Sequence, residues 1–171
     1  DFFTAPAKNI AVSAIRALNK FVLVTSISDN PSLTDGNNLF DNTNRANDPN
    51  NAGVPLTYSY LKDAWETLAA MDDTDGNPIE LGDEIVILVG PNKYADGLTL
   101  AASDTNPHVA NNETNILKPF IKRVVKVPFW TNEWSIVSPG AKGFTLGYLE
   151  GHRTPIIEDL GEEPTTEQLR W

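Results

Sequence analysis

Side chains capable of acid–base or metal chemistry are few in this sequence. The chain has two histidines, His108 and His152, which lie far apart, and neither has a second histidine at helical spacing. A histidine metal site would need such a partner. His152 follows Gly151, a pair typical of a turn. A Ser–His–Asp triad stays open, because its members need not be adjacent in sequence.

One acidic run has a composition close to that of a calcium loop. It reads Asp-Asp-Thr-Asp-Gly-Asn from Asp72 to Asn77. An EF-hand loop needs an acidic residue at its first position and a glutamate at its last. Here those positions hold Met71 and Gly82. The run therefore predicts a turn that ends the preceding helix.

Other catalytic signatures are missing or unspecific. The sequence contains no cysteine, which excludes a thiol nucleophile and cysteine metal sites. It also lacks a Gly-Lys-Ser/Thr phosphate loop, a GxGxxG fingerprint and a GxSxG elbow. Carboxylates near the end of the sequence could pair as in a glycosidase, but so acidic a chain offers such pairs everywhere. They are Glu150, Glu158, Asp159, Glu162 and Glu163. We predict no catalytic, cofactor-binding or metal-binding residue, and no enzyme.

One basic cluster stands out in this acidic sequence. It consists of Lys118, Lys122, Arg123 and Lys126. Two interpretations stay open. The cluster could complement an acidic patch, on another copy or on another part of the fold, or it could be the solvated face of a strand.

The four tryptophans are candidates for core or interface positions. Trp65 falls on an apolar helical stripe and is expected in the core. Trp130 flanks a predicted turn and is more open to an interface role. The other two are Trp134 and Trp171.

Charge limits the partners that this chain can have. Of its 171 residues, 13 are basic and 23 acidic, which gives a net charge of −10. Such a surface repels phosphate backbones, so we expect no sequence-specific nucleic-acid binding and no membrane docking. The apolar fraction of 40% is that of a globular protein. No apolar run approaches the length that spans a bilayer.

The first part of the sequence predicts a helix followed by a polar loop. Ile10, Ala14 and Leu18 recur at helical spacing, although the β-prone run from Phe21 to Val24 leaves the end of the helix open. Residues 28–55 are rich in Asn, Asp, Gly and Pro. Within them, Asp35-Gly36 predicts a tight turn, and Leu39-Phe40 an anchor to the body of the protein.

The middle of the sequence predicts a helix, a buried strand and a second helix. Residues 57–71 place Leu61, Trp65 and Leu68 on one helical face, with Thr57 as the cap. The apolar run 84–89 is typical of a strand buried on both faces. Pro91 then opens a short helix. Its expected inner face comprises Tyr94, Ala95, Leu98, Ala101 and Ala102.

The last part of the sequence is rich in β-prone residues. After a polar loop at 103–115, strands are expected at 124–127, 134–137, 144–149 and 155–158. The connections at 130–133 and 139–143 are typical of hairpins. The predicted fold class is α+β.

Several stretches, taken in order, resemble a known family. They are Ala14–Asn19, Asp35–Phe40, Pro55–Ile79, Leu88–Ala95, Trp134–Val137 and Tyr148–Pro155. In order and spacing they are similar to the major capsid protein of tailed phages, specifically the Mu-like major head subunit group, whose fold is the Hong Kong 97 type. The sequence departs from that family at Asn44, where the family often has His, and at Gly90, where it usually has a second Pro.

The resemblance implies a division of the chain. Residues 1–27 would be the end of the spine helix of the peripheral domain, and 28–56 the long polar loop. Residues 57–150 would form the axial domain of mixed helices and sheet, and 151–171 a return segment toward the peripheral domain. A subunit of this type also has an N-terminal arm and further peripheral strands, so the resemblance implies a longer gene product.

The resemblance also implies a function and partners. A subunit of this family would assemble with other copies into pentamers and hexamers of an icosahedral shell that encloses DNA, in the host cytoplasm, with scaffold and portal proteins as further partners. It would use no cofactor. An encapsulin-like nanocompartment shell protein is a related alternative with the same fold. A small acidic hydrolase or glycan-binding domain is the alternative from another class, supported by the carboxylates and aromatic residues alone.

Overall fold

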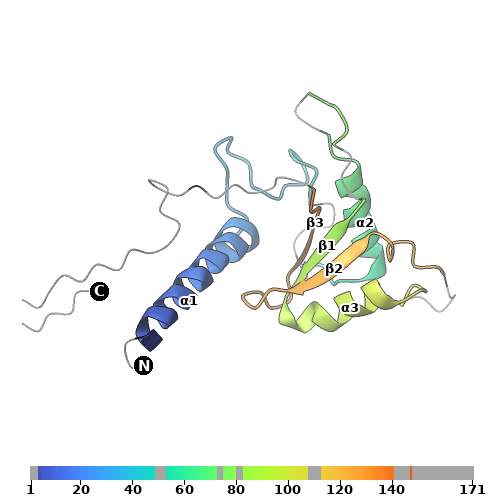
Figure 1. Ribbon diagram of the computed structural model, residues 1–171. Helices are drawn as coiled ribbons and strands as arrows, with labels where there is room; N and C mark the ends of the chain where they lie inside the picture. Colours follow the sequence, from blue (N-terminus) through green and yellow to red (C-terminus); the bar gives the residue numbers. More distant parts are fainter. Residues whose placement is uncertain are drawn as a thin grey trace, which may run out of the picture. The chain divides into compact units, whose positions relative to one another are not determined.

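The computed structural model describes residues 4–48, 53–72, 75–79, 83–107, 113–140 and 147. The chain divides into two compact units, residues 1–17 with 146–171, and residues 18–145. In the first unit the structure describes residues 4–17, which are helical, and Gly147. The second unit holds the sheet and the polar loop (Figure 1).

The predicted first helix is confirmed as α1, Thr4–Lys20. It continues into η1, a π-helix over Phe21–Ser28, in which the N–H of Asp29 donates to the carbonyl of Val24 at 2.8 Å. The β-prone run that obscured the helix end is therefore the start of this π-helix. On α1, Ile10 and Ile15 are 43% and 62% exposed, so this apolar stripe contributes little to a core of the single chain.

The second unit is built on a three-stranded mixed sheet. Its strands are β1, Ile85–Val89, β2, Ile121–Lys126, and β3, Trp134–Val137, in the order β2-β1-β3. β1 pairs parallel with β2 and antiparallel with β3. Since β1 lies in the middle and is covered on both faces, its run of apolar residues is explained, and the predicted buried strand is confirmed.

The predicted hairpin at 130–133 is wrong. These residues do connect β2 with β3, but β1 lies between the two strands, and they do not pair with each other. The physical reason is that β1 is the most apolar of the three strands and gains most from a hydrogen-bonded neighbour on both edges. The connection therefore crosses the end of β1, where the N–H of Gly90 donates to the carbonyl of Glu133 at 2.8 Å.

Helices α2, Tyr58–Ala69, and α3, Tyr94–Ala102, cover one face of the sheet. A short 3-10 helix, η2 over Pro91–Lys93, leads into α3, which runs beneath the strands in Figure 1. The core between these layers contains six fully or almost fully buried side chains. They are Leu56, Leu61, Ile87, Val89, Leu100 and Leu117.

The predicted inner face of α3 is correct at Tyr94, which packs against the core, but wrong at Ala95, Leu98 and Ala102, which are exposed. The buried positions are Gly97 and Leu100, whereas Leu98 is 45% exposed. A Cβ added at Gly97 would lie 2.9 Å from Cγ1 of Val124 on β2. The missing side chain lets the helix approach the strand, and this close approach sets which face turns inward.

The face of α2 is as predicted for two of its three residues. Leu61 is fully buried, and Trp65 packs on the core with its ring 5.0 Å from that of Phe120. Leu68 is half-buried and lies at a groove described below. Thr57 is the N-cap residue, but its side chain makes no capping hydrogen bond, so that part of the prediction is wrong.

A second, smaller core lies where the end of β2 meets η1. It contains Ile27, Val127 and Trp130, with Phe40 packed against it. Trp130 is 4% exposed, and its indole N–H donates to the carbonyl of Leu23 at 2.8 Å. Trp130 is therefore a core residue that connects η1 to the sheet, and the interface role considered for it is not supported.

The loop after α3 is folded back on itself. Asn115 is buried and donates to the carbonyls of Leu100 and Ser103 at 2.7 and 3.0 Å. Asn106 is also buried, and its N–H donates to the carbonyl of Glu113. The strand expected at 155–158 lies outside the described residues, and of the strand expected at 144–149 only Gly147 is described, where the backbone is not in a strand. None of the helices in the described part is long and apolar enough to cross a membrane.

Candidate functional site

The residues with possible acid–base chemistry lie mostly outside the described part. His108 and His152 are there, as are the C-terminal carboxylates Glu150, Glu158, Asp159, Glu162 and Glu163. The acidic run is described only in part. Asp72 is bridged to Pro78, and Gly76 has a φ of +81°, as expected for the predicted turn. Among the described residues, no three His, Cys, Asp or Glu side chains come together as metal ligands.

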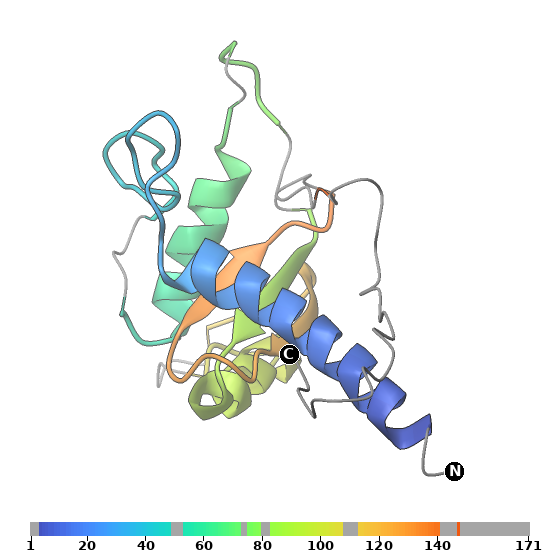
Figure 2. The same cartoon turned by 90° about the vertical axis from the view of Figure 1, so that its left-hand side faces the viewer.

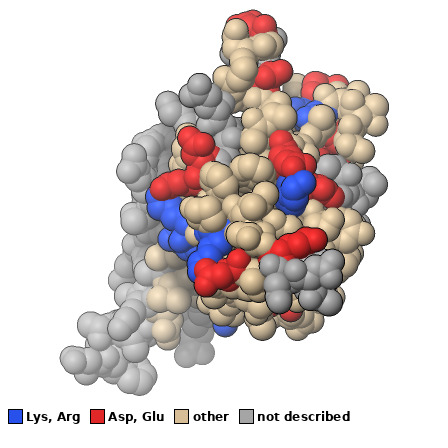
Figure 3. All heavy atoms as spheres, turned by 90° about the vertical axis from the view of Figure 1, so that its right-hand side faces the viewer, with Lys and Arg blue, Asp and Glu red and all other residues tan. Residues whose placement is uncertain are grey.

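Two of the four residues in the basic cluster are paired with acidic groups of the same chain. Lys118 pairs with Asp104, and Lys122 with Glu84. Lys126 lies over the ring of Tyr94, 5.7 Å from its centroid. On the face drawn in Figure 3, Lys and Arg side chains likewise lie next to Asp and Glu side chains. These exposed pairs contribute little stability, but they show that part of the cluster complements another part of the fold.

Arg123 is the member of the cluster without such a match. It is exposed on β2, and it forms no ion pair with any carboxylate that the structure describes. Its register partner on β1 is Val86. The guanidinium is therefore available to a group outside the described chain.

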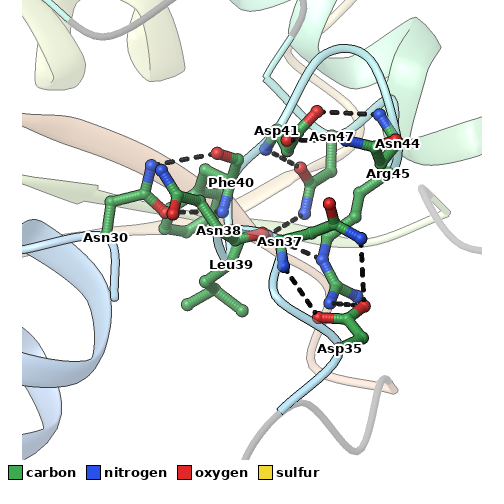
Figure 4. Close-up of polar contacts among 10 residues, drawn as sticks. All are labelled: Asn30, Asp35, Asn37, Asn38, Leu39, Phe40, Asp41, Asn44, Arg45 and Asn47. Carbon is green, nitrogen blue, oxygen red and sulfur yellow. Dashed lines mark hydrogen bonds and ion pairs between the residues drawn. The ribbon is translucent and has the colours of Figure 1, made fainter. Parts of the chain in front are cut away.

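The long polar loop is ordered by its own side chains (Figure 4). Asn30 binds the backbone of Phe40 at two points, with Nδ2 donating to the carbonyl at 2.9 Å and Oδ1 accepting from the N–H at 2.7 Å. Asn47 binds the residues on either side of Phe40. Its amide donates to the carbonyl of Leu39 and accepts from the N–H of Asp41, each at 2.8 Å. The two amides therefore replace the backbone partners that a sheet would provide.

An ion pair and a carboxylate cap complete this loop. Arg45 donates to Asp35 at 2.6 Å and, through Nε, to the carbonyl of Asn38 at 2.9 Å. The carboxylate of Asp41 accepts from the N–H groups of Asn44 and Thr43. Hydrogen bonds from the backbone of Asn44 lower the pKa of Asp41, and those from Asn37 lower the pKa of Asp35. Both carboxylates are thus held in their charged form.

The predicted tight turn in this loop is confirmed, and so is the anchoring role of Phe40, one of the two residues predicted as the anchor. Gly36 has a φ of +81°, and its N–H donates to the carbonyl of Leu33 at 2.9 Å. Phe40 packs against the smaller core. Asn30 has a φ of +45°, a conformation that Asn adopts more readily than most residues. Residues 30–47 of the loop are therefore held in one conformation by their own hydrogen bonds.

A groove of about 560 Å³ lies between this loop, α2 and β3. In Figure 2 the loop stands at the upper left, beside α2. Its lining includes Thr67 and Leu68 of α2, Met71 just after that helix, and Ser135 and Ile136 of β3. Trp134 closes one end, where its indole N–H donates to the carbonyl of Val54 at 2.9 Å.

Two carboxylates border the groove. Burial raises the pKa of Asp48 above its ordinary value. Glu133 accepts from the backbone N–H groups of Thr131 and Asn132 at 2.5 and 2.8 Å, and these bonds lower its pKa. Among the described residues that line the groove there is no Lys or Arg. Their lining is thus mixed apolar and uncharged polar, with two carboxylates as its only described charges.

No local sequence pattern predicted the groove or the hydrogen bonds by which Asn30 and Asn47 hold the loop backbone. The density of Asn in residues 28–48 was a signal of side-chain hydrogen bonding to the backbone, but the partners lie up to ten residues away and come together only in the folded loop. The groove involves three elements that are far apart in sequence, and no local pattern marks it.

Comparison with known proteins gives one match. A family model described as phage capsid protein matches residues 1–171, which is the whole sequence. No curated protein and no solved structure matches the chain. Because this model covers residues 1–171, the chain belongs to the phage capsid protein family and is a structural protein of the virion capsid.

Proposed function

We propose that the chain is part of the major head subunit of a tailed phage or prophage, of the Mu-like group and with the Hong Kong 97-type fold. Copies would assemble into pentamers and hexamers that tile an icosahedral shell around DNA. The observation that carries this proposal is the capsid family match over residues 1–171. The order and spacing of the sequence stretches named above support the finer assignment.

The arrangement of the described elements is consistent with such a subunit. A long helix, α1, precedes the polar loop and a compact unit of mixed helices and sheet. In the proposed division, residues 1–27 end the spine helix, 28–56 form the loop, 57–150 the axial domain and 151–171 the return segment. The exposed side chains of Val12 and Ile15, which are three residues apart and adjacent on the surface of α1, support contact with another copy.

The net charge suits a shell that encloses nucleic acid. At −10, the chain repels phosphate, so packed DNA would not adhere to the inner wall. An encapsulin-like compartment would share the fold but enclose protein cargo. The content of the particles therefore separates the two proposals.

The test is expression of the full-length protein, followed by sedimentation and negative-stain electron microscopy. We expect closed shells of uniform diameter that sediment far ahead of a monomer. Particles from infected or induced cells should contain DNA, whereas protein cargo in place of DNA would support the encapsulin alternative. Monomers that stay dispersed at high concentration would contradict the proposal.

A further inference from the structure

The two edges of the sheet differ sharply in charge. β2 carries Lys122, Arg123 and Lys126, all exposed, whereas β3 reads Trp-Ser-Ile-Val and carries no charge. Within the described residues, no further strand pairs with the outer side of either edge strand. Charged side chains on an edge oppose pairing with a like edge, and a charge-free edge remains open to pairing.

The open edge borders the acidic groove. Trp134, Ser135 and Ile136 of β3 line it, and Asp48 and Glu133 supply its two carboxylates. Asp48 is half-buried and makes no ion pair with a described cation. A cationic partner at this point would therefore meet an unmatched carboxylate in a partly desolvated place, where charge attraction is stronger than in water.

The opposite edge offers such cations. Arg123 and Lys126 form no ion pair with a described carboxylate, while Lys122 is paired with Glu84. Lys126 projects over Tyr94 on the α3 face of the sheet. Since side chains alternate along a strand, Arg123 projects from the other face. The edge thus carries positive charge on both sides of its backbone.

We infer that the β2 edge of one copy docks against the groove and β3 edge of a second copy of this chain. This inference rests on the proposed function, because it names the surfaces through which copies would meet. Pairing of β2 with β2 would oppose like charges, and pairing of β3 with β3 would bring the carboxylates together. Only the unlike pair matches charge and offers the free backbone of β3 for strand addition.

The topology makes this contact head-to-tail. β2 and β3 are the two edges of one sheet. Each copy therefore presents the positively charged β2 edge on one side and the acidic groove beside β3 on the other. A contact between two different surfaces repeats from copy to copy and gives a closed ring when the rotation closes. Rings of this kind are what pentamers and hexamers require.

Cysteine crosslinking tests the contact directly, because the natural chain has no cysteine. The full-length protein carrying both Lys122→Cys and Asn132→Cys is treated with a flexible bis-maleimide and run on a denaturing gel. Lys122 is exposed beside Arg123 and Asn132 is exposed at the groove, so Arg123 and Asp48 stay in place. We expect a ladder of covalent multimers beyond the dimer. Each single-cysteine variant should give dimers at most. The matched control pairs Lys122→Cys with Ser59→Cys, an exposed position outside the groove, and should give no ladder.

Charge exchange provides a second readout. Arg123→Glu and Asp48→Lys should each weaken association by about tenfold or more, and the double variant should regain most of it. Circular dichroism checks that each variant is folded. Single variants that assemble like the natural protein, or a double variant without recovery, would overturn the contact.

The outcomes separate this inference from the proposed function. Shells that form without a crosslink ladder would overturn the contact and leave the shell in place. A ladder without shells would support the contact and contradict the shell. Absence of both would overturn both.

Discussion

The side-chain amide of Asn30 forms two hydrogen bonds with the backbone of Phe40, at 2.9 and 2.7 Å. This pair fixes the start of the polar loop to the residue that packs on the smaller core. A loop that borders a proposed interface is in this way given a single shape before any partner arrives. Such preorganisation lowers the entropy cost of association.

Replacement of Asn30 tests this role. Asn30→Gly should lower the free energy of unfolding by about 1–3 kcal/mol, because two partly buried hydrogen bonds are lost. Asn30→Ala should lower it by about 1 kcal/mol more, because φ is +45° there and Ala has a Cβ. Asn37→Ala, whose hydrogen bonds are exposed, is the control and should change stability by less than about 0.5 kcal/mol. Equal effects at the two positions, measured by chemical denaturation, would contradict the role of Asn30.

Gly90 should not tolerate any side chain. A Cβ at this position would lie 2.5 Å from the carbonyl oxygen of Thr131 and 2.7 Å from its carbon, and both are backbone atoms that cannot rotate away. We expect Gly90→Ala to lower the free energy of unfolding by about 3 kcal/mol.

The matched control for Gly90 is Gly140→Ala. A Cβ there would meet nothing nearer than Oγ of Ser138 at 3.9 Å. The free energy of unfolding of this variant, measured by thermal unfolding, should therefore stay within about 0.5 kcal/mol of that of the natural chain. A stable Gly90→Ala variant would show that the connection between β2 and β3 does not lie against the end of β1.

Acid should destabilise the turn before β3. Backbone N–H groups of Thr131 and Asn132 lower the pKa of Glu133 from its ordinary 4.5. The folded state therefore binds fewer protons at this group than the unfolded state. The stabilisation by Glu133 is fully present above the pKa that this group has in the unfolded state. It is lost as the pH falls through the lower pKa that the group has in the folded state.

The variant Glu133→Gln checks this pH dependence. We expect its free energy of unfolding to fall less steeply between about pH 5 and pH 3 than that of the natural protein. Asp35 and Asp41 also have lowered pKa values, so they too make the protein less stable as the pH falls. In the Glu133→Gln variant, the slope of the free energy of unfolding against pH should therefore become smaller but not reach zero. An unchanged slope would mean that Glu133 does not hold the turn.

Asp48 should behave in the opposite way. Burial raises its pKa above 3.8, so the folded state binds more protons there, and stability declines as the pH rises through the folded pKa. Asp48→Asn removes that charge, and we expect a small gain in stability of the isolated subunit at neutral pH. The same variant should weaken assembly if Arg123 of a second copy is its partner. Lower stability together with unchanged assembly would assign Asp48 a purely structural role.

The sequence indicated the regular elements well where a pattern was local. The apolar run of β1 and the residues 134–137 of β3 appear as expected, because alternation and apolar density act over a few neighbouring residues. The fold class and the α2 helix follow from the same kind of signal. The π-helix η1 was obscured, since Phe21 to Val24 is equally typical of a strand.

Long-range arrangements could not be predicted in this way. Gly97 is the point at which α3 approaches Val124, a contact that no neighbouring residue in the sequence indicates. The Trp130 indole binds a carbonyl 107 residues away, a partner that no local pattern reveals. The groove likewise borders β3, which pairs with β1 and not with β2, the strand that precedes it in sequence.

Cryo-electron microscopy of particles assembled from the full-length protein tests the central claim most directly. The account predicts an icosahedral shell in which the unit 18–145 repeats around fivefold and sixfold axes, with β2 of each copy facing the groove of its neighbour. Purified protein that yields only discrete monomers, or particles without icosahedral symmetry, would contradict it.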